Sequence, residues 1–164
     1  MDQTAKIEVK VDEDHIRRTG QCSPEDALVE LVWNSLDASS TEVYVRIARN
    51  NLGGIQSIEV EDNGSGIHSD HLATTFGSLG RSEKPIVKLN SRGLPLHGRL
   101  GEGRFKAYRL GAQVEWQTKV LSGGPISITG EFSSPGYFLV KPLETQFPKS
   151  NGTRFLAYNS YEAQ

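Results

Sequence analysis

The stretch S-P-E-D-A-L-V-E-L-V-W-N-S-L-D-A, residues 23–38, has the pattern of a helix around which the rest of the chain folds. Its start is well marked, because Ser23 can cap the helix and a proline follows at the first helical position. Most of the following side chains are apolar, which predicts a helix that is buried on most sides. Glu30, Asn34 and Asp37 interrupt this pattern at spacings of four and three, which places them on one helix face.

A polar stripe on a buried helix requires an explanation, because burying a carboxylate without a partner is costly. One interpretation is that these side chains bond to neighbouring backbone groups or form a salt bridge. The other interpretation is that they line a pocket and bind a ligand. The helix pattern alone favours neither.

Length and composition are typical of one ordinary globular domain, since 36% of the 164 residues are hydrophobic and 23% are charged. The net charge of -2 gives no general reason to expect nucleic-acid binding, although local basic patches remain open. The single cysteine, Cys22, excludes an internal disulfide and provides no metal-ligand spacing. We find no signal sequence and no apolar run of membrane-spanning length, so we expect a cytoplasmic protein, or a nuclear one in a eukaryote.

The order of the remaining elements is typical of an α+β fold. Strands are predicted at residues 6–11, 42–49, 55–61, 113–121, 126–132, 137–140 and 153–158, and short helices at 69–76, capped by Ser69, and 105–110. The strands at 42–49 and 55–61 are expected to form a hairpin whose apolar face packs against the central helix. We therefore predict a two-layer α/β sandwich, with a mixed, mainly antiparallel sheet and helices on one face.

Two glycine-containing stretches are candidate ligand contacts. E-D-N-G-S-G-I at residues 61–67 follows a strand, and its glycines permit a sharp turn and a close approach. Asp62 at this turn either accepts a hydrogen bond from a ligand amine or caps the turn. G-R-L-G-E-G-R-F-K-A at residues 98–107 runs into a helix, where free backbone N–H groups and nearby cations suit a phosphate. The spacing fits neither a Walker loop nor a Rossmann loop.

The order and separation of these stretches resemble the GHKL ATPase superfamily, which includes gyrase B, the ninety-kilodalton heat-shock chaperone, histidine kinases, MutL and the MORC proteins. E-L-V-W-N-S-L-D-A (30–38) is similar to its first motif and D-N-G-S-G (62–66) to its second. G-R-L-G-E-G (98–103) is similar to the third, and G-T (152–153) to the fourth. The resemblance covers nearly the whole chain and implies the Bergerat fold. It is strongest to the MutL, MORC and chaperone branch.

The resemblance implies ATP and Mg²⁺ as ligands and a role for each motif. Glu30 would be the general base, Asn34 the metal ligand, and Asp37 a supporting group behind them. Asp62 would accept the adenine amine, and Thr153 would complete a water-assisted contact beneath the base. The implied nucleotide-binding residues are Asn34, Asp37, Asp62, Gly64, Gly66, Ile67, Gly98, Gly101, Glu102, Gly103, Arg104, Phe105, Lys106 and Thr153.

The third motif departs from several family members by carrying Arg104 and Lys106, of which we favour Lys106 as a phosphate contact. Residues 77–103 would form a mobile lid over the nucleotide. We also expect a single-domain N-terminal module (residues 1–164) of a longer protein that forms a homodimer and carries a downstream transducer domain or binds a partner protein. Two functions stay open: a slow Mg-dependent ATPase, and a nucleotide-gated binding module whose hydrolysis is incidental. Nucleic acid remains an open partner, and no membrane partner is expected.

Overall fold

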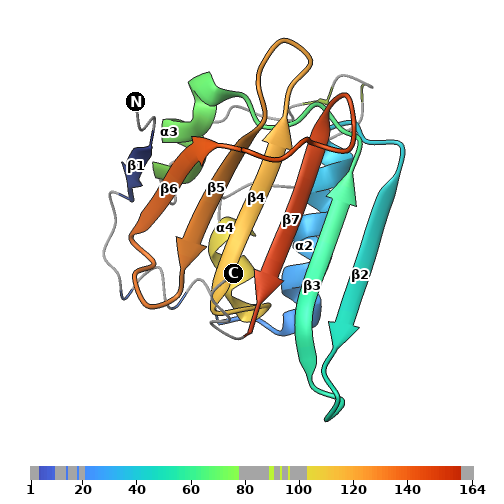
Figure 1. The fold of residues 1–164 in the computed structure, drawn as a ribbon, viewed down its shortest axis with the longest axis vertical. Coiled ribbons are helices and arrows are strands. Elements are labelled where there is room, and N and C mark those ends of the chain that lie inside the picture. Colours follow the sequence, from blue (N-terminus) through green and yellow to red (C-terminus); the bar gives the residue numbers. More distant parts are fainter. Residues whose placement is uncertain are drawn as a thin grey trace.

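The computed structural model of the chain describes residues 4–9, 14, 18, 21–77, 89–90, 93, 96 and 103–159. Within these residues seven strands form one sheet, in the order β1-β6-β5-β4-β7-β3-β2 (Figure 1). Every neighbouring pair in this order is antiparallel. The strands are β1 (Ala5–Glu8), β2 (Val43–Arg49), β3 (Ile55–Asp62), β4 (Gln113–Lys119), β5 (Ile126–Glu131), β6 (Tyr137–Pro142) and β7 (Gly152–Tyr158).

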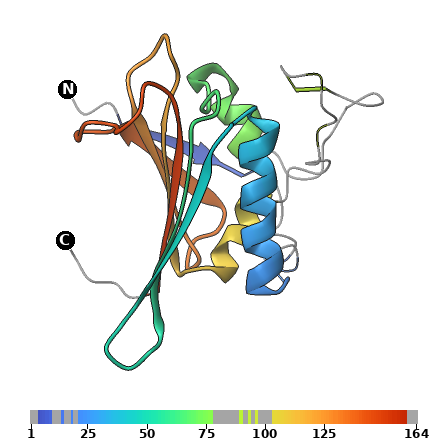
Figure 2. The same cartoon turned by 90° about the vertical axis from the view of Figure 1, so that its right-hand side faces the viewer.

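The helices among the described residues lie on one face of this sheet (Figure 2). They are α2 (Pro24–Asp37), η1 (Ser69–His71), α3 (Leu72–Gly77), α4 (Gly103–Lys106) and η2 (Ala107–Arg109). The predicted two-layer α+β sandwich is therefore confirmed. In the described parts of the chain, no helix combines the length and the apolar character needed to cross a membrane.

Local sequence sets both ends of α2. Ser23 Oγ accepts a hydrogen bond from the backbone N–H of Asp26 at 3.0 Å, which satisfies one free donor of the first turn. At the other end Ala38 N–H still bonds to Asn34 O, and Ser39 takes the left-handed conformation with φ 62°. A left-handed residue after the last turn stops a helix, so α2 ends where the sequence predicted.

The expectation that α2 is buried on most sides is wrong. Ala27, Leu31 and Ser35 face the core, spaced four residues apart, and are at most 5% exposed. Trp33 is 39% exposed and Val29 53%, because both lie on the face turned away from the sheet. Only one side of α2 can touch a sheet when no second layer covers it, so apolar composition overestimated its burial.

The core between the two layers is built around aromatic side chains. Phe76 of α3 and Phe138 of β6 meet edge to face with centroids 5.0 Å apart. Trp116 of β4 lies 5.3 Å from Phe76 and 5.1 Å from the ring of Phe155 on β7. These contacts join α3 to three strands and fix the position of the helical layer over the sheet.

The hairpin β2–β3 packs against the core through β3 more than through β2. Ile58 and Val60 of β3 are buried, whereas Val45 and Ile47 of β2 are 42% and 48% exposed. Val43 alone of the predicted β2 face packs against the core. The reason is that β2 is the edge strand, which has a neighbouring strand on one side only and meets α2 over a small part of its length.

Smaller predictions need correction in their details. The residue before η1 is His68, and no side chain caps this helix, so the predicted Ser69 cap is wrong. The helix predicted at residues 105–110 is a turn of α-helix followed by a 3-10 turn, α4 and η2. Residues 10 and 11 of the first predicted strand, and most of the predicted lid, lie outside the described residues.

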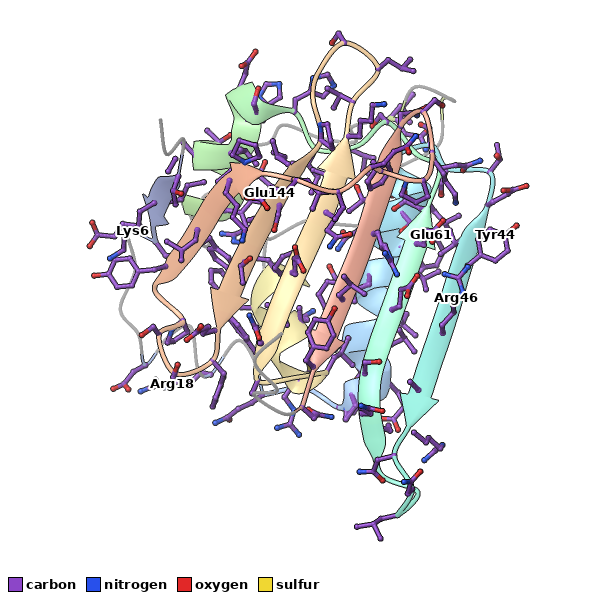
Figure 3. All side chains as sticks on the ribbon, in the orientation of Figure 1. Lys6, Arg18, Tyr44, Arg46, Glu61 and Glu144 are labelled. Atoms are coloured by element: carbon purple, nitrogen blue, oxygen red, sulfur yellow. The ribbon has the colours of Figure 1, made fainter. Side chains whose placement is uncertain are left out.

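The outer face of the sheet carries charged side chains instead of helices. Glu61 of β3 forms ion pairs with Lys149 at 2.9 Å and with Arg46 of β2 at 3.1 Å. Figure 3 shows Glu61, Arg46 and Tyr44 close together on this face, at the β2 edge. Lys149 also lies over the ring of Tyr44, 5.1 Å from its centroid. This cluster stabilises the edge of the sheet on the side away from the helices.

Candidate functional site

A cavity of about 400 Å³ lies between α2, the sheet and the short helices. Its volume is in the range of pockets that bind small organic molecules, about 300–1,000 Å³. Residues from all four predicted motifs line it. Those among the predicted site residues are Glu30, Asn34, Asp37, Asp62, Gly66, Ile67, Gly103, Arg104 and Thr153.

Of the predicted site residues that the structure describes, three do not line this cavity. Gly64 and Phe105 lie behind its walls: the Gly64 N–H bonds to Asp62, and Phe105 is fully buried in the core. Lys106 contacts Glu30 without lining the cavity. Gly98, Gly101 and Glu102 lie outside the described residues.

Asp62 marks one end of the cavity and is held in a fixed orientation. Its Oδ1 accepts hydrogen bonds from the backbone N–H groups of Gly64 at 2.8 Å and Thr153 at 3.2 Å. Its Oδ2 accepts a hydrogen bond from Ser35 Oγ of α2 at 2.9 Å. A carboxylate has about four acceptor sites, so Oδ2 can still accept a donor from a ligand.

Burial changes the charge behaviour of Asp62. The side chain is 4% exposed, and this desolvation raises its pKa, against the opposing effect of the Gly64 and Ser35 hydrogen bonds. Its hydrogen-bond donors, Ser35 Oγ and the backbone N–H groups of Gly64 and Thr153, are all neutral groups. A buried carboxylate that faces a cavity and is bonded only to neutral donors is arranged to receive a polar donor from a ligand.

Two hydroxyl groups form the floor beneath Asp62. Thr118 Oγ1 of β4 accepts a hydrogen bond from Ile67 N–H at 2.9 Å and donates to Gly152 O at 3.0 Å. It lies 3.1 Å from Thr153 Oγ1, and because the single Thr118 hydroxyl proton is donated to Gly152 O, Thr153 Oγ1 donates in this pair. This pair links the second and fourth motifs through β4.

The backbone conformation at residue 66, next to the Thr118–Thr153 pair, requires a glycine. Its φ is +75°, in the left-handed region, and a Cβ there would lie 2.4 Å from the backbone oxygen of Lys119. Any side chain would therefore collide with β4. The glycine of the second motif thus lets the turn approach β4 closely enough for Thr118 to bond to Ile67.

The opposite end of the cavity joins α2 to α4. A Cβ on Gly103 would lie 2.9 Å from Glu30 Cγ and 3.0 Å from Asn34 Nδ2, so α4 starts directly against both side chains. Lys106 Nζ lies 3.4 Å from Glu30 Oε2, and both side chains are 26% exposed. The predicted polar stripe thus combines both interpretations: it lines a pocket, and one of its members has an ion-pair partner.

Arg104 brings a positive charge into the cavity wall. It is 9% exposed, and burial lowers its pKa to about 10. Its guanidinium lies over the ring of Phe105, 4.5 Å from the centroid. A guanidinium at this place can neutralise an anionic ligand group. The sequence favoured Lys106 for this role, whereas Arg104 is the one of the two that lines the cavity.

Magnesium would have few protein ligands here. In the described residues no group of three or more His, Cys, Asp or Glu side chains could hold a metal ion. Mg²⁺ bound to a nucleotide keeps several waters and needs only one or two protein oxygens, so the single amide oxygen of Asn34 fits such an ion.

Sequence reasoning missed Ser35 and Thr118, which both orient the Asp62 end. Ser35 could have been found, because a hydroxyl four residues after Leu31 lies on the core face of α2, where a polar group needs a partner. Thr118 gives no such signal, because threonine is ordinary in a strand and its partners are 34 and 51 residues away.

The family model described as "Histidine kinase-, DNA gyrase B-, and HSP90-like ATPase" matches residues 22–129 of the chain. This range includes α2, the turn after β3, α4 and β4, and so the larger part of the cavity wall.

Curated relatives of the chain include DNA mismatch repair proteins MutL. The chain is 36% identical to MutL of Aquifex aeolicus over 91 residues, which are 51% of this chain and 21% of that protein. It is 49% identical to MutL of Neisseria meningitidis over 49 residues, 30% of this chain and 7% of the relative. It is 38% identical to MutL of Klebsiella pneumoniae over 77 residues, which are 43% of this chain and 12% of that protein. The chain thus spans about a fifth or less of the length of these relatives.

Proposed function

The chain belongs to the histidine kinase-, DNA gyrase B- and HSP90-like ATPase family, on its MutL-like branch, and from this premise we propose that it hydrolyses ATP slowly with Mg²⁺. The observation that carries the proposal is one cavity that is lined both by Asp62, a buried carboxylate bonded to neutral donors, and by Glu30 and Asn34. A purine and a triphosphate need two such different environments in one site.

Asp62 recognises the base in this proposal. Its Oδ2 accepts a hydrogen bond from the exocyclic amine of adenine, while Ser35 and the backbone of the second motif hold the carboxylate in place. The Thr153 hydroxyl, which is held by Thr118 Oγ1 and lines the cavity, binds a water beneath the base. A guanine would present an oxygen acceptor to the same carboxylate and is disfavoured.

Glu30 and Asn34 act at the phosphate end. Glu30 orients and deprotonates the attacking water as general base. Asn34 supplies an oxygen ligand to Mg²⁺, which neutralises charge on the phosphate oxygens when bound. Asp37, which lines the cavity on the same helix face, supports Glu30 and Asn34, and the Arg104 guanidinium adds positive charge to the wall.

The lid and the assembly are further parts of the proposal. Residues 77–103 close over the nucleotide, and Gly98, Gly101, Glu102 and Gly103 bring backbone N–H groups to the phosphates. In a longer protein, closure creates a homodimer surface and engages a downstream domain or partner. The second candidate function, a nucleotide-gated binding module, is favoured by the exposed apolar face of α2 around Trp33, which a closed lid or partner could cover.

Glu30→Gln and Asn34→Ala test the proposal. We expect the wild-type chain to bind Mg-ATP in isothermal titration calorimetry and to release phosphate slowly. Glu30→Gln should keep ATP binding within about threefold and reduce hydrolysis at least about a hundredfold, because the base is lost but no binding contact. Asn34→Ala should weaken binding only when Mg²⁺ is present. No ATP binding by the wild-type chain, or full hydrolysis by Glu30→Gln, would show the proposal to be wrong.

A further inference from the structure

The short helix α4 packs closely against the Glu30 carboxylate. Oε2 lies 3.4 Å from Lys106 Nζ, and Gly103 leaves no room for a side chain, since a Cβ there would lie only 3.0 Å from Oε1. Gly103 and Lys106 are the first and last residues of α4, one helical turn apart. The carboxylate therefore lies beside the start of α4 and is paired with the ammonium at its end.

Lys106 reaches Glu30 from outside the cavity. Among the described residues the cavity lining includes Glu30, Gly103 and Arg104, but Lys106 is not part of it. The charges of Lys106 and Arg109 also oppose the rise that burial causes in the pKa of the Cys22 thiol, just before α2. Arg109 Nε donates a hydrogen bond to Cys22 O at 2.8 Å, which joins η2, the helix that follows Lys106, to the residues that precede α2.

We propose that Lys106 is a positioning residue that holds the Glu30 carboxylate toward the attacking water and makes no contact with the nucleotide. The inference rests on the proposed function, because Glu30 acts as a base only if ATP is hydrolysed here. The Glu30 side chain is 26% exposed. Without an ion-pair partner it would sample several rotamers, and only some of them would direct the carboxylate toward the attacking water. An ion pair with a fixed lysine selects one of them, which raises the effective concentration of the base.

The proposal separates turnover from binding. A lysine that bound phosphate would increase ATP affinity, whereas a lysine that positions Glu30 increases the hydrolysis rate at saturating ATP. Loss of one half-buried ion pair should slow hydrolysis about three- to tenfold and leave the dissociation constant for ATP within about twofold.

The experiment compares three variants of the chain, with ATP affinity from calorimetry and hydrolysis from single-turnover quench. Lys106→Met should show the slower hydrolysis and unchanged affinity, and Lys106→Arg should recover most of the rate because it keeps the cation. Arg46→Met is the control, since it removes ion pairs with Glu59 and Glu61 on the outer face of the sheet and should change neither quantity. Lys106→Gln replaces Lys106→Met if methionine impairs folding.

A double mutant identifies the route of the effect. In a Glu30→Gln background, Lys106→Met should cause no further loss of residual hydrolysis, because the group that it positions is gone. A tenfold loss of ATP affinity in Lys106→Met, with its rate at saturation unchanged, would instead identify Lys106 as a phosphate ligand and overturn the inference. A hydrolysis rate of Lys106→Met equal to that of the wild-type chain would also overturn the inference.

Crystal structures of the wild-type chain and Lys106→Met give a readout that does not depend on ATP. We expect the Glu30 carboxylate to leave its position against Gly103 in the variant. If the wild-type chain binds no ATP, the proposed function fails. If the carboxylate stays in place in the variant, the positioning role fails, whatever the chain binds.

Discussion

Glu61 and Asp62 are neighbours in β3, yet the sheet sends them to opposite environments. Glu61 lies on the outer face between Lys149 and Arg46, and Asp62 lies on the helix side at the end of the cavity. Both carboxylates are less than 9% exposed by residue. The pKa of Glu61 is nevertheless lowered and that of Asp62 raised, so burial alone does not set the charge of either group.

The difference lies in their partners. Burial would raise the pKa of Glu61, but the hydrogen bonds and charges of Lys149 and Arg46 outweigh it. Asp62 accepts hydrogen bonds from Ser35 and two backbone N–H groups, and the effect of burial on its pKa prevails. Glu61 is paired with two cations of the protein itself and stabilises the sheet. Asp62 keeps a hydrogen-bond acceptor that faces the cavity and can bind a ligand.

The largest difference between the two carboxylates is expected in ATP affinity, when Asp62 and Glu61 are each replaced by the corresponding amide. Asp62→Asn replaces an acceptor by a donor opposite the adenine amine, so we expect about a hundredfold weaker binding. Glu61→Gln should change affinity less than about threefold, because its side chain lies on the other face of the sheet. Calorimetry with Mg-ATP measures both, and equal losses in the two variants would refute the division of roles.

In stability the order of the two variants should be the opposite, with the larger loss in Glu61→Gln. Glu61→Gln removes a charge from a cluster with two cations and should lower the free energy of unfolding by about 1–2 kcal/mol. Asp62→Asn should cost less, because it also removes the desolvation of a buried charge. Urea unfolding followed by tryptophan fluorescence gives both values, and a larger loss in Asp62→Asn would contradict this order.

The smallest expected effect is on pH dependence, because the pKa values of the two carboxyl groups are shifted in opposite directions. The pKa of Asp62 is raised above 3.8, so acidification should weaken ATP binding at a pH higher than for an ordinary aspartate. Its protonation also relieves the burial of charge in the folded state. The pKa of Glu61 is lowered below 4.5, so its stabilisation is complete above that pH and is lost as pH falls through the lower folded value. Carbon-13 NMR titration of the two carboxyl groups measures both shifts, and shifts of the same sign would contradict the assignment.

The sequence by itself determined the central helix, its limits and the order of the strands. Ser23 and the proline after it mark the start of α2, and period-two alternation marks the strands, because capping and side-chain direction depend on residues only a few positions apart. The spacing of Glu30, Asn34 and Asp37 was likewise enough to place them on one face, and all three line the cavity.

Only the tertiary structure decided which partners these residues have. The bond from Ser35 to Asp62, the hydroxyl pair of Thr118 and Thr153, and the ion pair of Lys106 with Glu30 join residues 27 to 76 positions apart. The same holds for β2, whose alternating sequence predicts a packed face but which lies at the sheet edge with Ile47 half exposed. Local pattern states which face a side chain takes, whereas burial, charge pairing and pKa depend on what packs against that face.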